Sequence, residues 1–169
     1  MSKKIKRLLA KKNKKKIVSL TAYSKNIAKI LDKHCDIILV GDSLANVLYG
    51  MTNTHNVKLN TIIEHSISVK KGVKKSLMVV DMPKGSYKTP TQAKKNAKLI
   101  IKETHCDAVK IESNNKNFKI IKEIIKANIP VIVNIEYTTQ YKKKFKVAGK
   151  NKSELKKLIK EAISIEKAG

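Results

Sequence analysis

The chain has 169 residues, which is enough for one domain with a substantial core, and its net charge of +25 rests on 38 basic residues against 13 acidic ones. Nucleic-acid recognition favours the planar guanidinium group of arginine and aromatic rings that stack on bases, but Arg7 is the one arginine and Trp is absent. The charge therefore indicates solvated lysine surfaces and no nucleic acid partner. The alternative function, from a different class of protein, is a basic RNA-associated module. No apolar run approaches the roughly 18 residues that span a membrane and no secretory segment is evident, which predicts a cytoplasmic protein without a membrane partner.

A basic segment precedes the first predicted strand. Residues 1–16 carry 9 basic and no acidic side chains and are interpreted as a basic N-terminal helix that covers the bottom of a sheet. The first strand is predicted at 17–22, and a helix follows from Ser24, which suits an N-cap. The residues of that helix with the spacing of a core face are Ile27, Ile30 and Leu31.

Three short apolar runs each end in a carboxylate. Ile37 to Val40 is followed by Gly41-Asp42-Ser43, Leu77 to Val80 by Asp81, and Ala108 to Ile111 by Glu112. Short runs rich in Ile, Leu and Val are typical of strands buried on both faces of a parallel sheet, and Lys110 is the one charged residue within the three runs. Because ligands are held at the carboxyl ends of such strands, these carboxylates are predicted to meet at one functional face.

The remaining segments complete a regular alternation of strands and helices. A loop is predicted at 43–59, and Thr89-Pro90-Thr91-Gln92 has the N-cap, Pro and Gln spacing that starts a helix. A fifth strand is predicted from Val131 to Ile135, followed by a polar loop at 136–150. The other predicted helices cover 60–72, the region of Phe118, Ile121 and Ile125, and the stripe Leu155, Leu158, Ile159, Ala162 and Ile163.

The alternation predicts the fold class. Right-handed crossovers between parallel strands give either an open doubly wound sheet or part of a barrel, and the first strand is not followed by a glycine-rich phosphate loop. We therefore predict an α/β protein, a (β/α)8 TIM barrel of which about the first five βα units are present, in a single incomplete domain of residues 1–169. Its two uncovered strand edges predict an oligomeric or poorly soluble isolated chain.

The tripeptide His-Cys-Asp occurs twice, at 34–36 and 105–107. Two His-Cys pairs have the ligand types of a tetrahedral zinc site. Both tripeptides, however, precede strands and so lie on the face opposite the carboxylates, in short helix-to-strand turns. The interpretation that we favour is a chance likeness of two turns, with Cys35 and Cys106 as free thiols, because a disulfide is not expected in the cytoplasm.

The strand-end residues suit a particular chemistry. Asp42 and Asp81 are hard oxygen ligands for Mg²⁺, and Glu112 can bind the ion directly or through a water molecule. Lys110 lies two residues before Glu112 on the same side of its strand, where it can offset the charge of a substrate carboxylate, and Ser43 adds a hydroxyl. A divalent cation chelated by a 2-oxo acid polarises the keto group and stabilises an enolate. The alternative is that the carboxylates only cap neighbouring helices.

Several segments resemble one family. Leu20-Thr21-Ala22-Tyr23, Ile38 to Leu44, Asp81-Met82-Pro83, Gly85-Ser86-Tyr87 and Val109-Lys110-Ile111-Glu112 are similar, in order and spacing, to ketopantoate hydroxymethyltransferases. Phe145 to Lys150 resembles a later loop of the same family. The resemblance implies a TIM barrel of the phosphoenolpyruvate/pyruvate type, commonly a homo-oligomeric decamer. It also implies transfer of a hydroxymethyl group from 5,10-methylenetetrahydrofolate to 3-methyl-2-oxobutanoate, giving 2-dehydropantoate for pantothenate biosynthesis.

The resemblance also assigns roles to residues of this chain. It implies that Asp42 and Asp81 are Mg²⁺ ligands and that Glu112 is the second acidic residue of the metal site. Ser43 and Lys110 match groups that, together with Asp42 and Asp81, hold the 2-oxo acid. These assignments coincide with the chemistry expected from the residue types.

The sequence also departs from the family. Asn134 stands where a substrate-contacting histidine is usual, Glu136 where glycine is expected, and Lys84 where an aromatic residue is usual. The catalytic glutamate of the family is expected on a sixth strand, beyond Gly169. We therefore predict a hydroxymethyltransferase shortened at its C-terminus, and the alternative is an inactive remnant of that enzyme.

Overall fold

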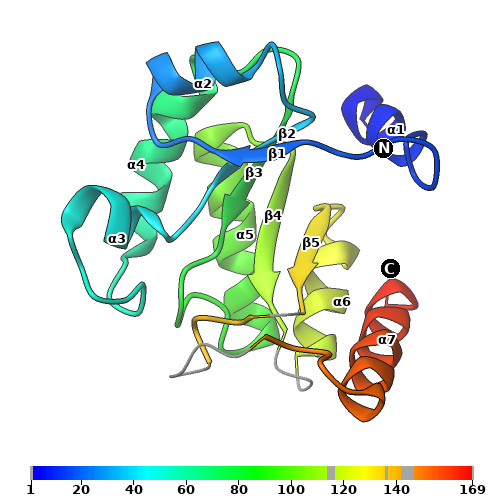
Figure 1. The fold of residues 1–169 in the computed structure, drawn as a ribbon. Coiled ribbons are helices and arrows are strands. Elements are labelled where there is room, and N and C mark those ends of the chain that lie inside the picture. Colours follow the sequence, from blue (N-terminus) through cyan, green and yellow to red (C-terminus); the bar gives the residue numbers. More distant parts are fainter. Residues whose placement is uncertain (1, 114–116, 136, 142–146, 169) are drawn as a thin grey trace.

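The computed structural model describes residues 2–113, 117–135, 137–141 and 147–168. Within these residues, five parallel strands form one sheet in the order β1-β2-β3-β4-β5 (Figure 1). The strands alternate with helices along the chain, as the sequence predicts. The strands are β1 (Ser19–Thr21), β2 (Ile37–Val40), β3 (Leu77–Asp81), β4 (Ala108–Glu112) and β5 (Val131–Asn134).

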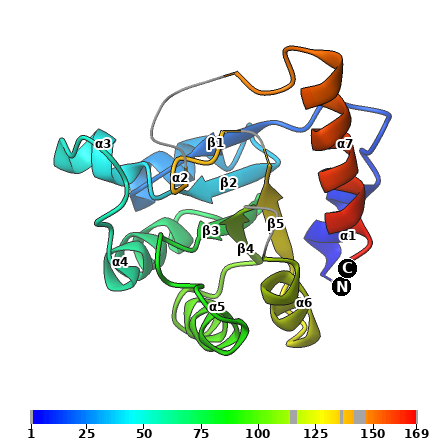
Figure 2. The same ribbon diagram turned by 90° about the horizontal axis from the view of Figure 1, so that it is seen from below.

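Helices surround this sheet unevenly. Helices α4, α5 and α6 lie together along one face of the sheet, whereas α1 and α7 lie away from them (Figure 2). The C-terminal end of α7 approaches the N-terminal segment, where Lys12 pairs with Glu166 at 3.1 Å. No helix in the described part of the chain is long and apolar enough to cross a membrane. The helices are α1 (Lys3–Leu9), α2 (Lys25–Leu31), α3 (Leu44–Tyr49), α4 (Leu59–Lys70), α5 (Pro90–Thr104), α6 (Phe118–Lys126) and α7 (Lys152–Glu166).

The two faces of the sheet have different partners because side chains alternate along each strand. One face joins the large core under the helices, and its fully buried members include Ile38, Val40, Val80 and Val109. The other face forms a smaller cluster centred on Leu77, Val79 and Ala108, against which Ile5 and Leu8 of α1 pack. The predicted N-terminal helix therefore does cover part of the sheet, although it is shorter than residues 1–16.

The same alternation positions the candidate site. Asp81 follows Val79 by two residues, and Lys110 and Glu112 follow Ala108 by two and four. These polar side chains therefore belong to the face of the small cluster, at the carboxyl ends of the strands. Helix α5 begins as predicted, because the Thr89 hydroxyl accepts a hydrogen bond from the backbone N–H of Gln92 and Pro90 occupies the first turn.

Two predictions about local structure are wrong. The 43–59 segment is not all loop, because α3 forms directly after Ser43. Ile27 and Ile30 of α2 do not face the core and are 49% and 59% exposed. The reason is that α2 approaches α4 through small residues: Ala28 is fully buried, and a Cβ on Gly72 would lie 2.4 Å from the carbonyl oxygen of Lys25.

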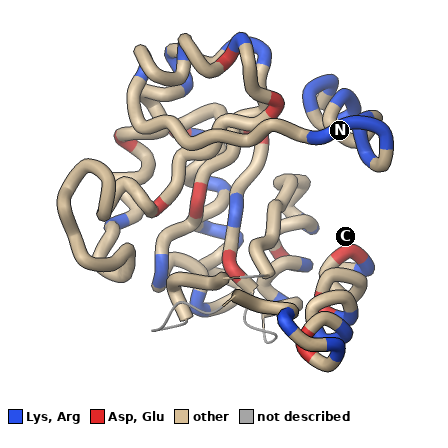
Figure 3. Tube along the Cα trace, viewed as in Figure 1, with Lys and Arg blue, Asp and Glu red and all other residues tan. Residues whose placement is uncertain are grey.

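The predicted apolar stripe on the last helix is not buried among the described residues. Leu155, Ile159 and Ile163 of α7 are each about half exposed, at 49%, 51% and 46%. Helix α7 lies apart from α4, α5 and α6 (Figure 2), and Ile165, near its C-terminal end, packs against the main core. Lysines are found on α1, α2 and α7, consistent with solvated basic surfaces on separate elements (Figure 3).

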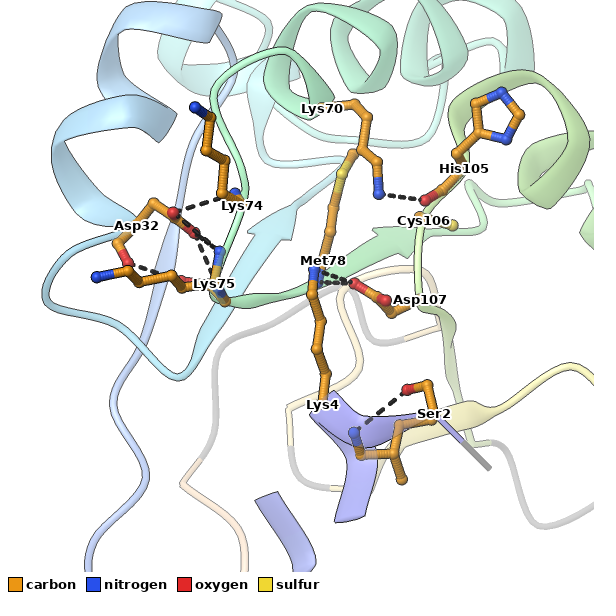
Figure 4. Close-up of polar contacts among 12 residues, drawn as sticks. Ser2, Lys4, Asp32, Lys70, Lys74, Lys75, Met78, His105, Cys106 and Asp107 are labelled. Atoms are coloured by element: carbon orange, nitrogen blue, oxygen red, sulfur yellow. Dashed lines mark hydrogen bonds and ion pairs between the residues drawn. The ribbon is translucent and has the colours of Figure 1, made fainter. Parts of the chain in front are cut away.

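The repeated His-Cys-Asp tripeptides have a structural role at the amino ends of the strands. Asp36 accepts hydrogen bonds from the backbone N–H of Val18 (3.0 Å) and from the Lys11 ammonium. Asp107 accepts them from the N–H of Met78 (2.8 Å) and from the ammonium of Lys4 (3.1 Å), which α1 supplies (Figure 4). Each aspartate thus ties the start of its neighbouring strand to the basic N-terminal segment.

The cysteines of the two tripeptides are free and buried. Among the described residues, no three or more His, Cys, Asp or Glu side chains gather in a way that could hold a metal ion. The hydrogen bonds described above account for the aspartate of each tripeptide.

Candidate functional site

Asp81 and Lys110 lie next to each other at the carboxyl edge of the sheet. The parallel register pairs these two residues directly across β3 and β4. The Lys110 Nζ atom donates a hydrogen bond of 2.7 Å to Asp81 Oδ1, and the backbone N–H of Asp42 donates one of 3.1 Å to Asp81 Oδ2. Asp42 and Asp81 are 6% and 3% exposed, so the end of β3 and the turn after β2 share a buried polar site.

Burial governs the ionisation of Asp81. Loss of water, and to a smaller extent the nearby Asp42 charge, raise the pKa of this carboxyl, the Lys110 ammonium lowers it, and the net result is a pKa of about 6. The lysine therefore compensates the charge only in part. A buried carboxyl with a pKa of this kind is a frequent property of functional sites, where a cation or substrate completes the charge balance.

Gly41 allows the turn after β2 to pass close to Asp81. A Cβ at this position would lie 2.9 Å from Ser43 Oγ and 3.3 Å from Asp81 Oδ2. The Ser43 hydroxyl is held by the hydroxyl of Tyr23, 2.8 Å away. Because glycine has no Cβ, Gly41 lets the Ser43 hydroxyl and the Asp81 carboxylate lie close to the backbone of this turn.

Glu112 is placed nearby but is already engaged. Its Oε1 atom accepts a hydrogen bond from the Thr139 hydroxyl (3.0 Å), and its Oε2 atom accepts one from the backbone N–H of Gln140 (2.8 Å). Burial raises the pKa of Glu112, the two hydrogen bonds lower it, and Asp42 raises it, with a net rise. Both oxygens of Glu112 therefore face the segment after β5 rather than the pair formed by Asp42 and Asp81.

Gln140 and Tyr87 belong to this site, although the residue types alone did not predict them. Gln140 Nε2 donates hydrogen bonds to Asp42 Oδ2 (3.0 Å) and to the Met82 carbonyl (3.2 Å). The Tyr87 hydroxyl donates to Gln140 Oε1 and accepts from the backbone N–H of Glu112. Tyr87 lies in the segment Gly85-Ser86-Tyr87, which resembles the family, whereas Gln140 lies in a stretch where the sequence departs from it, and neither residue type has a characteristic spacing.

Of the three positions that depart from the family motifs, the structure describes Asn134 and Lys84. Asn134, at the end of β5, donates a hydrogen bond from its side chain to the carbonyl of Tyr137 (3.2 Å), and so shapes the turn that leads to Gln140. Lys84 is exposed in the loop after β3. Glu136 and the 142–146 part of the predicted polar loop lie outside the described residues.

The donor set fits a magnesium ion held by two carboxylates. With all three acids ionised, the group of Asp42, Asp81, Glu112 and Lys110 carries a net charge of −2 in a buried setting, which matches a divalent cation. Mg²⁺ typically takes one or two protein carboxylates and keeps several waters. The described residues contain no converging cluster of three or more such side chains, so the carboxylates available to a cation here are the linked pair of Asp42 and Asp81.

A polar cavity adjoins this group. It has a volume of about 500 Å³ and shares Thr139 with the acidic site. The Thr139 hydroxyl contacts Glu112, whereas the Thr139 carbonyl contacts His55 Nε2 at 3.0 Å. The other residues that line the cavity are Asn46, Thr52, Asn53, Thr54 and Tyr137.

Comparison with known proteins gives consistent results. The sequence profile of a family described as ketopantoate hydroxymethyltransferase matches residues 2–169. A 3-methyl-2-oxobutanoate hydroxymethyltransferase of Pelagibacter ubique (strain HTCC1062) is 52% identical over all of this chain, which spans 66% of that protein. One from Rhizobium rhizogenes (strain K84 / ATCC BAA-868) is 41% identical over 95% of this chain and 60% of its own length.

Solved structures show the same fold at low identity. A phosphonopyruvate hydrolase in complex with oxalate and Mg²⁺ aligns with all of this chain and 61% of its own, with a TM-score of 0.75 and 13% identity. A 2,3-dimethylmalate lyase, a member of the PEP mutase/isocitrate lyase superfamily, aligns with all of this chain and 62% of its own, with a TM-score of 0.67 and 15% identity. The predicted partial (β/α) barrel is confirmed.

Proposed function

The chain belongs to the ketopantoate hydroxymethyltransferase family, and on this basis we propose that its strand-end carboxylates bind Mg²⁺ and a 2-oxo acid for hydroxymethyl transfer. The substrate that we propose is 3-methyl-2-oxobutanoate, the hydroxymethyl donor is 5,10-methylenetetrahydrofolate and the product is 2-dehydropantoate. The observation that carries the proposal is the buried pair of Asp42 and Asp81. The backbone N–H of Asp42 donates a hydrogen bond to Asp81, and the Lys110 ammonium partly neutralises the charge of the pair.

Asp42 and Asp81 are the proposed metal ligands, and Glu112 is proposed to interact with the same metal through a water molecule. A bound divalent cation supplies Lewis-acid polarisation of the keto group, which acidifies the neighbouring C–H bond. The contribution of the protein is to keep the two carboxylates buried and close, so that their interaction with a cation is weakly screened by water. The net charge of −2 supports a divalent ion at this position.

Lys110 and Ser43 are proposed to hold the 2-oxo acid. Lys110 has 20% of its side chain exposed and already points at the acidic pair, so its ammonium can turn to a substrate carboxylate that approaches from the open side. The Ser43 hydroxyl, held by Tyr23, can donate a hydrogen bond to the same ligand. None of residues 1–169 is assigned the role of the proton-abstracting glutamate that the family resemblance implies.

The folate co-substrate, the homo-oligomer and the cytoplasmic location remain predictions. The polar cavity next to Thr139 supports the presence of a second ligand, because it adjoins the acidic site through a shared residue. The chain spans 66% and 60% of the two relatives compared above, so we propose binding of metal and 2-oxo acid as the function of these residues.

Calorimetric titration of the purified chain tests this function. We expect 3-methyl-2-oxobutanoate to bind in the presence of Mg²⁺ and not in its absence, and we expect Asp42→Asn and Asp81→Asn to abolish the binding. Glu103→Gln is a matched control, because it removes one negative charge from an exposed position of α5. Binding that is independent of Mg²⁺, or that survives both aspartate substitutions, would overturn the proposal.

A turnover assay with 5,10-methylenetetrahydrofolate separates binding from catalysis. Formation of 2-dehydropantoate that depends on Asp42 and Asp81 would extend the function of these residues to catalysis. Binding without product would leave the metal and 2-oxo acid site in place and support the inactive remnant as the description of this polypeptide.

A further inference from the structure

We propose that Gln140 is a positioning residue of this site, which orients Asp42 for the metal and, with Thr139, holds Glu112 in the outer sphere. The inference rests on the proposed binding of Mg²⁺ by Asp42 and Asp81. It adds a residue that acts through other side chains and need not contact the metal itself. Gln140 is 3% exposed and lies on a segment that follows β5, far along the chain from the carboxylates that it joins.

Gln140 connects the ends of three strands. Its side-chain amide reaches Asp42 after β2 and the Met82 carbonyl after β3, and its backbone N–H reaches Glu112 at the end of β4. Thr139 adds a second contact to Glu112 and is itself tied to His55 through its carbonyl. The two-residue segment 139–140 is thus the element that sets the relative positions of these carboxylates.

The orientation of the Gln140 amide follows from Tyr87. The Tyr87 hydroxyl accepts the backbone N–H of Glu112 (3.3 Å) and lies 2.5 Å from Gln140 Oε1, which can only accept, so Tyr87 is the donor in this contact; Tyr141 is a further neighbour of the same hydroxyl. Burial raises the pKa of Tyr87, which keeps this hydroxyl protonated and able to donate. With the amide oxygen occupied by Tyr87, the amide NH₂ group must face Asp42 and the Met82 carbonyl.

The orientation of the Gln140 amide gives Asp42 and Glu112 different roles toward a metal ion. Gln140 engages Asp42 Oδ2, so Asp42 Oδ1 is the atom best placed to meet a cation. Both oxygens of Glu112 accept hydrogen bonds from segment 139–140, whereas the partners of Asp81 are Lys110 and the N–H of Asp42, within the acidic group itself. We therefore expect a cation beside Asp42 and Asp81 to reach Glu112 through water. Residues of this kind, which orient metal ligands without binding the metal, typically contribute tenfold to 100-fold in affinity.

A purely structural role for Gln140 would be filling space in a buried position. Gln140→Met separates the two roles, because methionine has a similar volume and no amide. Tyr87→Phe removes the hydroxyl that orients the amide. Gln92→Met is the matched control: this glutamine, in the first turn of α5, contacts the backbone at Lys88 and Gly85 and has no contact with the carboxylates among those that the structure shows.

The test is calorimetric titration of MgCl₂ into the full chain, with thermal unfolding of each metal-free variant recorded in parallel. We expect Gln140→Met to weaken Mg²⁺ binding by about tenfold to 100-fold, and Gln92→Met to leave it within about twofold of the parent chain. We expect Tyr87→Phe to weaken binding in the parent and to add little in the Gln140→Met background, since Tyr87 acts on the metal through Gln140.

The outcomes are separable. If the parent chain binds Mg²⁺ and Gln140→Met binds it equally well, the positioning role is overturned while the proposed function stands. Fully additive losses in the double variant would also overturn it, because Tyr87 would then act independently of Gln140. If the parent chain binds no Mg²⁺, the proposed function itself fails and the inference fails with it.

Discussion

The Lys110 ammonium lies 2.7 Å from Asp81 Oδ1, in a pair that the register of β3 and β4 places side by side. This lysine is the cation that the structure shows in contact with the buried carboxylates. Three acids lie around this cation, and burial, with a smaller contribution from the Asp42 charge, raises the pKa of both Asp81 and Glu112. We therefore expect the proposed binding of Mg²⁺ to depend on pH.

Mg²⁺ affinity is expected to rise with pH. The pKa of Asp81 in the folded, metal-free chain is about 6, above the ordinary value near 3.9, so folded Asp81 keeps its proton where the unfolded chain has lost it. The favourable contribution to folding is therefore complete below roughly pH 4 and is lost as the pH rises through about 6. Mg²⁺ must displace the same proton.

Calorimetry at several pH values checks this. Below the pKa of Asp81, affinity for Mg²⁺ should increase by up to about tenfold per pH unit, and it should level off above that pKa. Proton release on binding, measured in buffers of different ionisation enthalpy, should be largest at acidic pH. An affinity that stays constant between roughly pH 5 and pH 7 would contradict the linkage between Asp81 and the metal.

Lys110→Gln should affect the two ligands in opposite directions. Loss of the ammonium leaves the acids without their cation, so Mg²⁺ affinity should be maintained or increased. The 2-oxo acid loses a charged partner for its carboxylate, so its affinity should fall by about tenfold or more. Separate titrations of MgCl₂ and of the 2-oxo acid at saturating Mg²⁺ measure both. Lys102→Gln, on the exposed face of α5, is the matched loss of charge. Equal weakening of both ligands would argue against this division of roles.

Gly41→Ala should damage the site, and Gly72→Ala should damage the fold. A Cβ on Gly41 meets Ser43 Oγ at 2.9 Å and Asp81 Oδ2 at 3.3 Å, and these side chains can shift, so ligand binding should weaken at a cost in unfolding free energy of about 1 kcal/mol. A Cβ on Gly72 meets backbone atoms of α2, which cannot shift alone, so about 3 kcal/mol of stability should be lost. Urea unfolding and MgCl₂ titration of both variants distinguish the cases; the reverse pattern would refute the argument.

The sequence predicted the parts of the fold that depend on local chemistry. The apolar run Leu77 to Val80 forms a fully buried strand, and Thr89 with Pro90 begins α5, because propensity and burial agree at these positions. Ile27 and Ile30 have helical core spacing but are exposed. Their exposure results from the close approach of α2 to Gly72, a tertiary contact that periodicity along one helix does not contain.

The candidate site shows the same limit. Asp42, Asp81 and Glu112 were identified because a carboxylate after an apolar run has a recognisable pattern. The placement of Gln140 was not predictable from residue type, because it depends on the turn after β5 folding back across three strands. Contacts between residues as distant in the chain as Asp42 and Gln140 are decided by the path of that turn, to which the Asn134 side chain contributes through its hydrogen bond to Tyr137.

Asp32 should set part of the acid stability of the fold. Its carboxylate accepts backbone N–H hydrogen bonds from Lys74, Lys75 and Ser76 at the start of β3 (Figure 4 shows the two lysines). Burial acts to raise the pKa of Asp32, but these hydrogen bonds lower it below the ordinary value. The resulting stability is present above the unfolded pKa, near 3.9, and is lost as the pH falls through the folded pKa.

Asp32→Ala should therefore lower the free energy of unfolding at neutral pH by about 3 kcal/mol, since it leaves buried amides without acceptors. The difference from the parent chain should shrink as the pH falls below roughly 4, where the parent also loses the charge. Urea unfolding at neutral and acidic pH measures this difference. Asp32→Asn keeps one acceptor oxygen and should fall between the two. A pH-independent loss for Asp32→Ala would show that packing, and not the charged hydrogen bonds, is what Asp32 contributes.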